Sequence, residues 1–192
     1  VYLLETWEIS ETVAINGNNI ILKRHVALAG NMIKVTTSNS VVKISNLVID
    51  GNADQDGTKN KFRDYLVTNP AIYSEVGLSL NLENVTIKNN ATKVSGAGIY
   101  IKAVTSNVNY NLILKNTNII KNAIIMDSSV SSSERNFGAG IAIDNHSPDA
   151  QNIKIDLKVN NCDISQNTIV SLTGYHNKKS IQSYPRGGVG IG

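Results

Sequence analysis

The 192-residue chain contains one cysteine, three prolines, two phenylalanines and one tryptophan. A single cysteine excludes an internal disulfide framework and a metal site built from cysteines. No run approaches the roughly 18 consecutive apolar residues of a membrane-spanning helix, so we expect no membrane insertion by this segment. The formal net charge of +3 is too small to point to nucleic acid as a partner. The chain starts without Met and shows no signal peptide or anchor, so we expect a mature chain or an excised piece.

Asparagine and β-branched residues are abundant instead. The chain has 26 Asn, 24 Ile, 17 Val and 14 Gly. Ile and Val favour strands, whereas Asn and Gly favour turns that need a left-handed backbone. With 41% apolar and 17% charged residues, the composition is typical of a globular domain. It therefore predicts one domain built from many short strands joined by tight turns.

Two short patterns recur along the chain. The first, apolar-x-Asn-x-x-Ile-x-x-Asn, occurs at residues 44–52, 82–90, 114–122 and 159–167. The second begins with Gly-x-Gly-Ile and follows the last three copies, at residues 96–101, 138–143 and 188–192. Between the patterns lie polar stretches of different lengths. Constant short strands with variable connections are typical of a solenoid.

Each copy of the first pattern alternates with a period of two. In the first copy Leu47 and Ile49 fall on one side and Val48 falls on the other. Such alternation predicts a half-buried strand rather than a helix. For the third unit we expect strands at 112–115, 117–121 and 141–144. Earlier, less regular strands are expected at 7–9, 13–15, 20–23, 32–35 and 41–45.

The repeated asparagines predict stacked turns. If successive copies form coils of a parallel β-helix, equivalent residues lie about 4.8 Å apart. Asn tolerates the left-handed region, and its amide can donate to one neighbour and accept from the other. We therefore expect two columns of hydrogen-bonded amides. The first column comprises Asn46, Asn84, Asn116 and Asn161, and the second comprises Asn52, Asn90, Asn122 and Asn167.

These observations predict an all-β, single-stranded parallel β-helix with three strands per coil. About five or six coils would make a rod of about 25–30 Å. We expect one domain over 1–192, with an N-terminal cap and irregular coils at 1–40 and regular coils at 41–192. Nothing near Gly192 is typical of a cap, so we expect a piece of a longer solenoid or an end that a partner covers.

The two patterns resemble the right-handed parallel β-helix repeats of the pectate-lyase-like superfamily. They are most similar to the Asn-rich repeats of bacterial and archaeal surface adhesins and of chlamydial-type polymorphic outer-membrane proteins. The resemblance rests on the four Asn-x-x-Ile-x-x-Asn copies and on Gly-Ala-Gly-Ile at 96–99 and 138–141, and it covers roughly residues 9–192. It implies a right-handed coil. Because this superfamily holds both enzymes and binding proteins, the resemblance leaves the function open.

Candidate catalytic residues do not emerge from the sequence. Polysaccharide hydrolases pair two carboxylates, and the hydrolase motifs Asn-Thr-Asp, Gly-His-Gly and Arg-Ile-Lys are absent. Asp50 and Asp163 occupy different positions of the repeat, and Asp144 follows a strand whose counterpart carries Lys102. We therefore expect no carboxylate cluster. Cys162 occupies an inward position, which predicts a buried, unreactive thiol.

One acidic segment is a candidate calcium site. Asn52, Asp54 and Asp56 offer oxygen ligands at alternate positions, and Gly57 would make the turn. The glutamate that completes a full calcium loop is missing, because Arg63 stands twelve positions on. The alternative is a polar turn without metal. No other cofactor is predicted.

A basic and aromatic loop is the candidate ligand-binding segment. It carries Tyr175, Lys178, Lys179 and Arg186. These side chains could hold an acidic polysaccharide or a partner protein, and the alternative is a solvated loop.

The regular asparagine-rich coils and the lack of an acid cluster favour a non-catalytic module on the cell surface. We expect an extracellular or secreted adhesin or stalk whose variable loops bind a cell-surface glycan or a protein. Self-association, either end to end or lateral, is a further expectation. The alternative is a carbohydrate-active enzyme, a polysaccharide lyase or hydrolase, or a degenerate relative that only binds polysaccharide.

Overall fold

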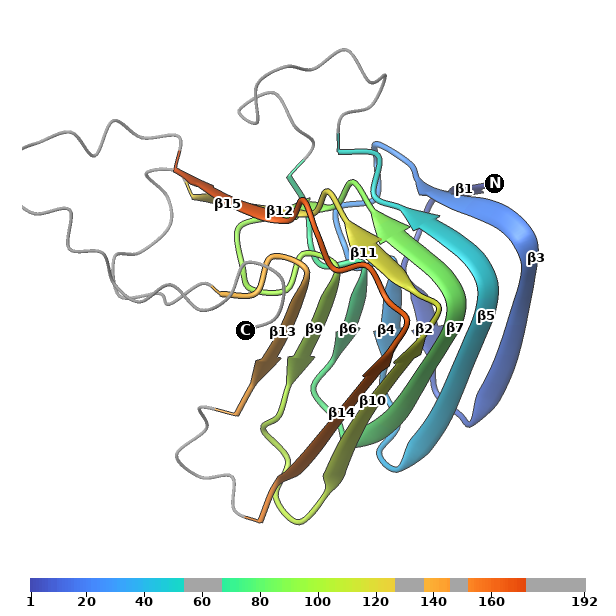
Figure 1. Cartoon of the computed structure of the whole chain (residues 1–192), viewed down its shortest axis with the longest axis vertical. Helices are drawn as coiled ribbons and strands as arrows, with labels where there is room; N and C mark the ends of the chain where they lie inside the picture. Colours follow the sequence, from blue (N-terminus) through green and yellow to red (C-terminus); the bar gives the residue numbers. More distant parts are fainter. Residues whose placement is uncertain (54–66, 127–136, 146–151, 172–192) are drawn as a thin grey trace, which may run out of the picture.

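The structure is a computed structural model that describes residues 1–53, 67–126, 137–145 and 152–171. These residues form β-strands and no helix, and every strand pair is parallel (Figure 1). The all-β prediction is therefore confirmed. Parallel neighbours cannot be joined by a hairpin, so the chain must leave each sheet before it returns.

The strands form three sheets. The largest sheet has the order β1-β3-β5-β7-β10-β14, with β11 also beside β7, and the other two have the orders β13-β9-β6-β4-β2 and β15-β12-β8. The first sheet contains β1 (Tyr2–Leu3), β3 (Val13–Arg24), β5 (Ser40–Asp50), β7 (Leu78–Lys88), β10 (Asn109–Lys115), β11 (Asn118–Ile120) and β14 (Lys154–Asn160). The second contains β2 (Trp7–Ile9), β4 (Ile33–Val35), β6 (Ile72–Ser74), β9 (Ile99–Lys102) and β13 (Ile141–Asp144). The third contains β8 (Ala91–Thr92), β12 (Ala123–Met126) and β15 (Thr168–Ser171).

The chain visits these sheets in turn. After β10 and β11 in the largest sheet it adds β12 to the three-stranded sheet and β13 to the five-stranded sheet, and it then returns as β14 beside β10. Each circuit therefore advances one strand along the stack, as Figure 1 shows for the side-by-side strands of the largest sheet. This arrangement is consistent with a β-solenoid.

Predicted and observed strands agree in most places. Strands β2 and β13 coincide with the predicted strands at 7–9 and 141–144. The predicted strands at 13–15 and 20–23 are joined in β3, where the pairing register shifts between Asn16 and Ile20. The sequence missed β6, because no glycine pattern precedes it, and it also missed β1. It missed the whole third sheet as well, because the predicted strands at 112–115 and 117–121 both lie in the largest sheet as β10 and β11.

Inward-facing apolar residues form rows across the largest sheet. Strand register places Val42, Leu80 and Leu112 side by side, and all three are buried. Burial of one such side chain stabilises the fold by about 1.5–3 kcal/mol relative to leaving it exposed. The predicted alternation is therefore confirmed in the middle of the stack. Thr117 also faces inward, where its hydroxyl donates to the Leu82 and Lys115 carbonyls.

Cys162 departs from the prediction, because its side chain is half-buried rather than buried. It belongs to the last turn beside β14, which is the final strand of the largest sheet among the described residues. The thiol donates to the Asn160 carbonyl at 3.2 Å.

An outer column of asparagines follows the sharp turns of the largest sheet. Asn46, Asn84, Asn116 and Asn161 have φ values of 52°, 54°, 49° and 52°, in the left-handed region that Asn tolerates. The Asn84 amide nitrogen donates to Asn46 Oδ1 at 3.1 Å, and Asn161 donates to Asn116 at 2.8 Å. The column extends to Asn16, which accepts from Asn46 at 3.1 Å. The strand pairs on both sides of the turn place Asn116 next to Asn84. These bonds fit the expected asparagine ladder.

An inner column is buried and runs in the opposite direction. Asn90 Nδ2 donates to Asn122 Oδ1 at 2.9 Å, and Asn122 Nδ2 donates to Asn167 Oδ1 at 3.0 Å. Asn90 and Asn122 are 1% and 0% exposed. The left-handed residue of these turns is the one before each asparagine, for example Asn89 or Lys121. Donors therefore point toward the C-terminal end in the inner column and toward the N-terminal end in the outer one.

Asn52 has other partners than the rest of its predicted column. It is itself left-handed, with a φ of 54°, and its Nδ2 donates to the Arg24 carbonyl at 3.2 Å. Its N–H donates to Asp50 Oδ1 at 2.9 Å. A third pair of stacked amides, in which Asn152 donates to Asn107 at 3.0 Å, was not recognised in the sequence.

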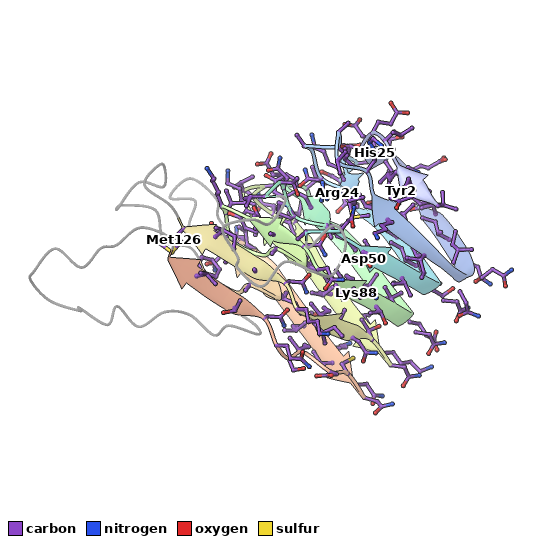
Figure 2. The ribbon with its side chains drawn as sticks, turned by 90° about the horizontal axis from the view of Figure 1, so that it is seen from above. Tyr2, Arg24, His25, Asp50, Lys88 and Met126 are labelled. Atoms are coloured by element: carbon purple, nitrogen blue, oxygen red, sulfur yellow. The ribbon has the colours of Figure 1, made fainter. Side chains whose placement is uncertain are left out.

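A buried arginine holds the N-terminal part of the stack together. The Arg24 guanidinium donates to the carbonyl oxygens of Leu28, Gly30 and Asn69. Burial lowers its pKa to about 10, which leaves it protonated at neutral pH. Figure 2 shows Arg24 at the same end of the stack as Tyr2 and His25.

Replacement of the buried ladder residue Asn122 by Ala should lower the free energy of unfolding by about 2–4 kcal/mol. The substitution leaves the Asn90 N–H and the Ile87 carbonyl without buried partners. Asn84→Ala should lower the free energy of unfolding by only about 1–2 kcal/mol, because alanine is strained in the left-handed backbone conformation of this turn. Asn84→Gly should lower it by less, because glycine adopts this conformation without strain. Urea denaturation of the three variants measures the differences. Equal losses for Asn122→Ala and Asn84→Gly would contradict the buried ladder.

Candidate functional site

Two tyrosines form a pair on the outer surface of the five-stranded sheet. Tyr73 on β6 and Tyr100 on β9 lie directly opposite each other in the strand register. Their ring centroids are 5.6 Å apart and the rings are tilted by 55°. Side chains alternate along each strand, so the neighbouring Ile72 and Ile99 are buried in the core. The backbone therefore fixes both rings on one face.

Charged residues surround the pair. The Tyr73 hydroxyl donates to Glu75 Oε1, and the Tyr100 hydroxyl donates to Asp144 Oδ2 at 3.2 Å. Lys102 Nζ lies 3.4 Å from Glu75 Oε1, and β4 places Lys34 opposite Tyr73. We call this group the tyrosine face. It comprises Lys34, Tyr73, Glu75, Tyr100, Lys102 and Asp144.

Burial and the neighbouring carboxylates fix the charge states of this face. Burial is the main cause that raises the pKa of both Tyr73 and Tyr100 above the usual value, and the acceptor carboxylates add to it. The pKa of Glu75 is lowered, mainly because its carboxylate accepts a hydrogen bond from the Tyr73 hydroxyl, and also because the positive charge of Lys102 lies nearby. At neutral pH the two tyrosines are therefore neutral donors and Glu75 is ionised.

The arrangement suits recognition better than proton transfer. Aromatic rings offer flat apolar surface, while carboxylates and ammonium groups bond to hydroxyl groups. A general acid in glycoside hydrolysis needs a raised pKa, so that it is protonated at neutral pH. Glu75 has the opposite shift.

The sequence did not predict this face. Glu75 follows the missed strand β6 and was not a candidate catalytic residue. Asp144 was compared only with Lys102, its counterpart on the neighbouring strand. The strand register places Lys102 between Asp144 on one side and Glu75, just after β6, on the other. Two acidic side chains therefore share a face that the sequence did not predict. The repeated pair Ile-Tyr, at 72–73 and 99–100, was the available signal.

Of the three predicted calcium ligands the structure describes Asn52, whose Nδ2 donates to the Arg24 carbonyl. Asp50 Oδ1 accepts from the Asn52 N–H and from Asn89 Nδ2, and Asp50 Oδ2 lies 3.7 Å from Lys88 Nζ. In Figure 2 Asp50 and Lys88 lie next to each other on the stack. Asp54 and Asp56 lie outside the described residues, so the calcium site stays a prediction. Within the described ranges, no group of three or more His, Cys, Asp or Glu side chains could hold a metal.

The predicted ligand-binding loop is not part of the described chain either. Tyr175, Lys178, Lys179 and Arg186 all lie in residues 172–192, outside the described ranges. Their role stays a prediction.

A scan against protein-family models found no match, and neither did searches of curated proteins and of solved structures. Within the described residues there is also no helix long and apolar enough to cross a lipid bilayer.

The lowered pKa of Glu75 makes a prediction about acid stability. A carboxylate with a depressed folded-state pKa stabilises the fold above the usual glutamate pKa of about 4.3, and this contribution is lost as the pH falls through the depressed value. Glu75→Gln should therefore be less stable than the parent at pH 7. The difference should shrink as the pH is lowered from about 5.

Urea midpoints across this pH range measure the effect. Tyr73→Phe supplies the matched test, because it removes the largest cause of the shift and should raise the pKa of Glu75 in a carboxyl NMR titration. If the pKa of Glu75 is the same in Tyr73→Phe as in the parent, the Tyr73 hydrogen bond is not the cause of the shift.

Proposed function

We propose that this chain is a non-catalytic extracellular module that binds saccharide on its tyrosine face. The proposed architecture is a right-handed parallel β-helix of the pectate-lyase-like type, with three strands per coil and about five or six coils. The circuit of the chain through three parallel sheets and the stacked asparagines support this architecture. In a surface protein such a module acts as an adhesin or stalk.

The Tyr73–Tyr100 pair is the observation that carries the binding proposal. Each ring is half-buried, so part of its surface remains open to solvent. A sugar ring packs its C–H groups on such a surface, while its hydroxyl groups bond to Glu75, Lys102 and Asp144. Positive and negative groups alternate across the face, which favours a neutral or mixed saccharide over a strongly charged one.

The strands hold this face in place before a ligand arrives. Both tyrosines lie in the middle of a five-stranded sheet, and each hydroxyl is fixed by a carboxylate. Binding therefore costs little side-chain entropy, because the rings and their polar neighbours are already ordered.

A carbohydrate-active enzyme is the second candidate. The observation that favours it is the pair of carboxylates, Glu75 and Asp144, that flank Lys102 on one face. The lowered pKa of Glu75 and the tyrosine hydroxyl on each carboxylate argue against an acid and base pair. A shared saccharide ligand would make the two candidates hard to separate by binding alone, so turnover has to be measured as well.

Removal of the rings should weaken saccharide binding. A panel of neutral and charged oligosaccharides on an array identifies a ligand, and calorimetry gives its Kd. We expect Tyr73→Ala and Tyr100→Ala each to weaken binding by about tenfold or more. Tyr2→Ala is the matched control, because Tyr2 is an exposed tyrosine at the N-terminal end of the stack and should leave the Kd unchanged.

The same panel separates binding from catalysis. The parent should release neither reducing ends nor unsaturated products from any bound saccharide. Turnover that Glu75→Gln or Asp144→Asn abolishes would establish the enzyme instead. Binding that survives both tyrosine substitutions would place the ligand elsewhere on the chain.

A further inference from the structure

The chain contains a single Asn-Gly dipeptide, Asn16-Gly17, and it lies at the sharp turn within β3. Asn16 belongs to the outer asparagine column, and its side chain is exposed, whereas Gly17 is buried. The other four asparagines of this column are followed by Leu, Val, Thr and Cys. Asn16 is therefore the one member of the column whose side-chain amide stands next to an unhindered backbone nitrogen.

Packing accounts for the glycine. A Cβ atom at Gly17 would lie 2.7 Å from the Asn46 carbonyl oxygen and 2.8 Å from Leu47 Cβ. Side chains do not approach backbone atoms this closely, so a larger residue would force the turn apart. The close approach of β3 to β5 therefore requires glycine after Asn16, and glycine leaves its nitrogen open to reaction with the neighbouring side chain.

Two N–H groups hold the side-chain carbonyl oxygen of Asn16. The Asn18 N–H donates to Oδ1 at 3.0 Å, and Asn46 Nδ2 donates to it at 3.1 Å. The first bond closes an Asx turn, which folds the side chain back over the Gly17 peptide. Both bonds draw electron density from the amide carbon Cγ. The pair therefore has the arrangement of an oxyanion hole, with donors in place for negative charge that develops on Oδ1.

We propose that Asn16 is a site of spontaneous covalent modification, at which the folded chain promotes its own deamidation. The Gly17 nitrogen gives up its proton to water and forms a bond with Asn16 Cγ. The charge that develops on Oδ1 is stabilised by the two N–H donors. The Cγ–Nδ2 bond then breaks, and Nδ2 leaves as ammonia with a proton from water. The product is a cyclic succinimide.

Water opens the succinimide in two ways. Addition at Cγ gives aspartate at position 16, and addition at the main-chain carbonyl carbon gives isoaspartate. The net reaction consumes one water, releases one ammonia and changes no oxidation state. Succinimide chemistry therefore leaves two products of equal mass at one position.

Both products add a negative charge to the exposed outer column. A carboxylate on the aspartate product still accepts from Asn46 Nδ2, and more strongly than an amide oxygen does. Isoaspartate instead lengthens the main chain, at the point where the pairing register of β3 with β5 already shifts. The aspartate product therefore changes the charge of this corner and keeps the ladder.

Mass spectrometry of the folded 192-residue chain tests the proposal, after storage at pH 8 and 37 °C and digestion at acidic pH. Asn16 should lose ammonia at least as fast as it does in a synthetic peptide of residues 12–22, which lacks the Asn46 donor. In water labelled with ¹⁸O each product molecule should gain one labelled oxygen. Chromatography should separate the modified peptide into an aspartate and an isoaspartate form.

Asn46→Gly removes one of the two donors and keeps the turn, because glycine adopts the left-handed conformation of Asn46. It should slow the loss of ammonia from Asn16 by about two- to tenfold, which is the value of one hydrogen bond. Asn84→Gly is the matched control, since it makes the same change one rung further along the column and should react at the parent rate. Thermal melting shows whether each variant keeps the parent fold.

A folded chain that loses ammonia from Asn16 more slowly than the peptide would overturn the proposal, because the fold would then protect the amide. An Asn46→Gly rate equal to the parent rate would overturn it as well, because the ladder bond would then have no part in the reaction. Aspartate without isoaspartate would show direct hydrolysis in place of the succinimide route. Saccharide binding is a separate question, since the tyrosine face lies on a different sheet.

Discussion

Equivalent residues of successive circuits lie side by side because every described strand pair is parallel and most pairs keep one register. Positions about 30–45 residues apart in the sequence thereby become neighbours at about 4.8 Å. A single residue type repeated at one position becomes a continuous column through the molecule. The apolar core, the asparagine ladders and the tyrosine pair are all columns or rows of this kind.

The two asparagine columns show how one residue type meets two different requirements. In the outer column the asparagine itself adopts the left-handed turn, and its amide is exposed to water. In the inner column the preceding residue takes the left-handed turn, and the buried amide satisfies main-chain groups such as the Ile87 carbonyl. Because an unpaired polar group costs more when it is buried, the inner column contributes more to stability. The two columns run in opposite directions, so their side-chain dipoles partly cancel.

The tyrosine face depends on the same register. Tyr73 and Tyr100 come from different circuits, and Glu75, Lys102 and Asp144 come from three. A rigid sheet turns these separate residues into one surface of rings and charges, on which both tyrosines are neutral donors and Glu75 is ionised.

Local pattern determined which segments are strands, which side of each strand faces the core and which asparagines occupy the turns. These features depend on neighbours within a few residues, such as the alternation of Leu47, Val48 and Ile49. Strand β6 was missed because it lacks the glycine pattern, and β3 was divided because it contains turn residues at Asn18 and Asn19. The short strands of the third sheet, β8, β12 and β15, were also missed.

The repeated asparagines predicted the order in which the circuits stack, but only the tertiary structure decided how the segments outside the repeats align. It decided that Tyr73 meets Tyr100, that Asn16 begins the outer column and that Asn52 bonds to Arg24. The physical reason is that the connections between strands differ in length. Outside the repeated patterns, distance along the chain therefore does not tell which residues the sheet hydrogen bonds align.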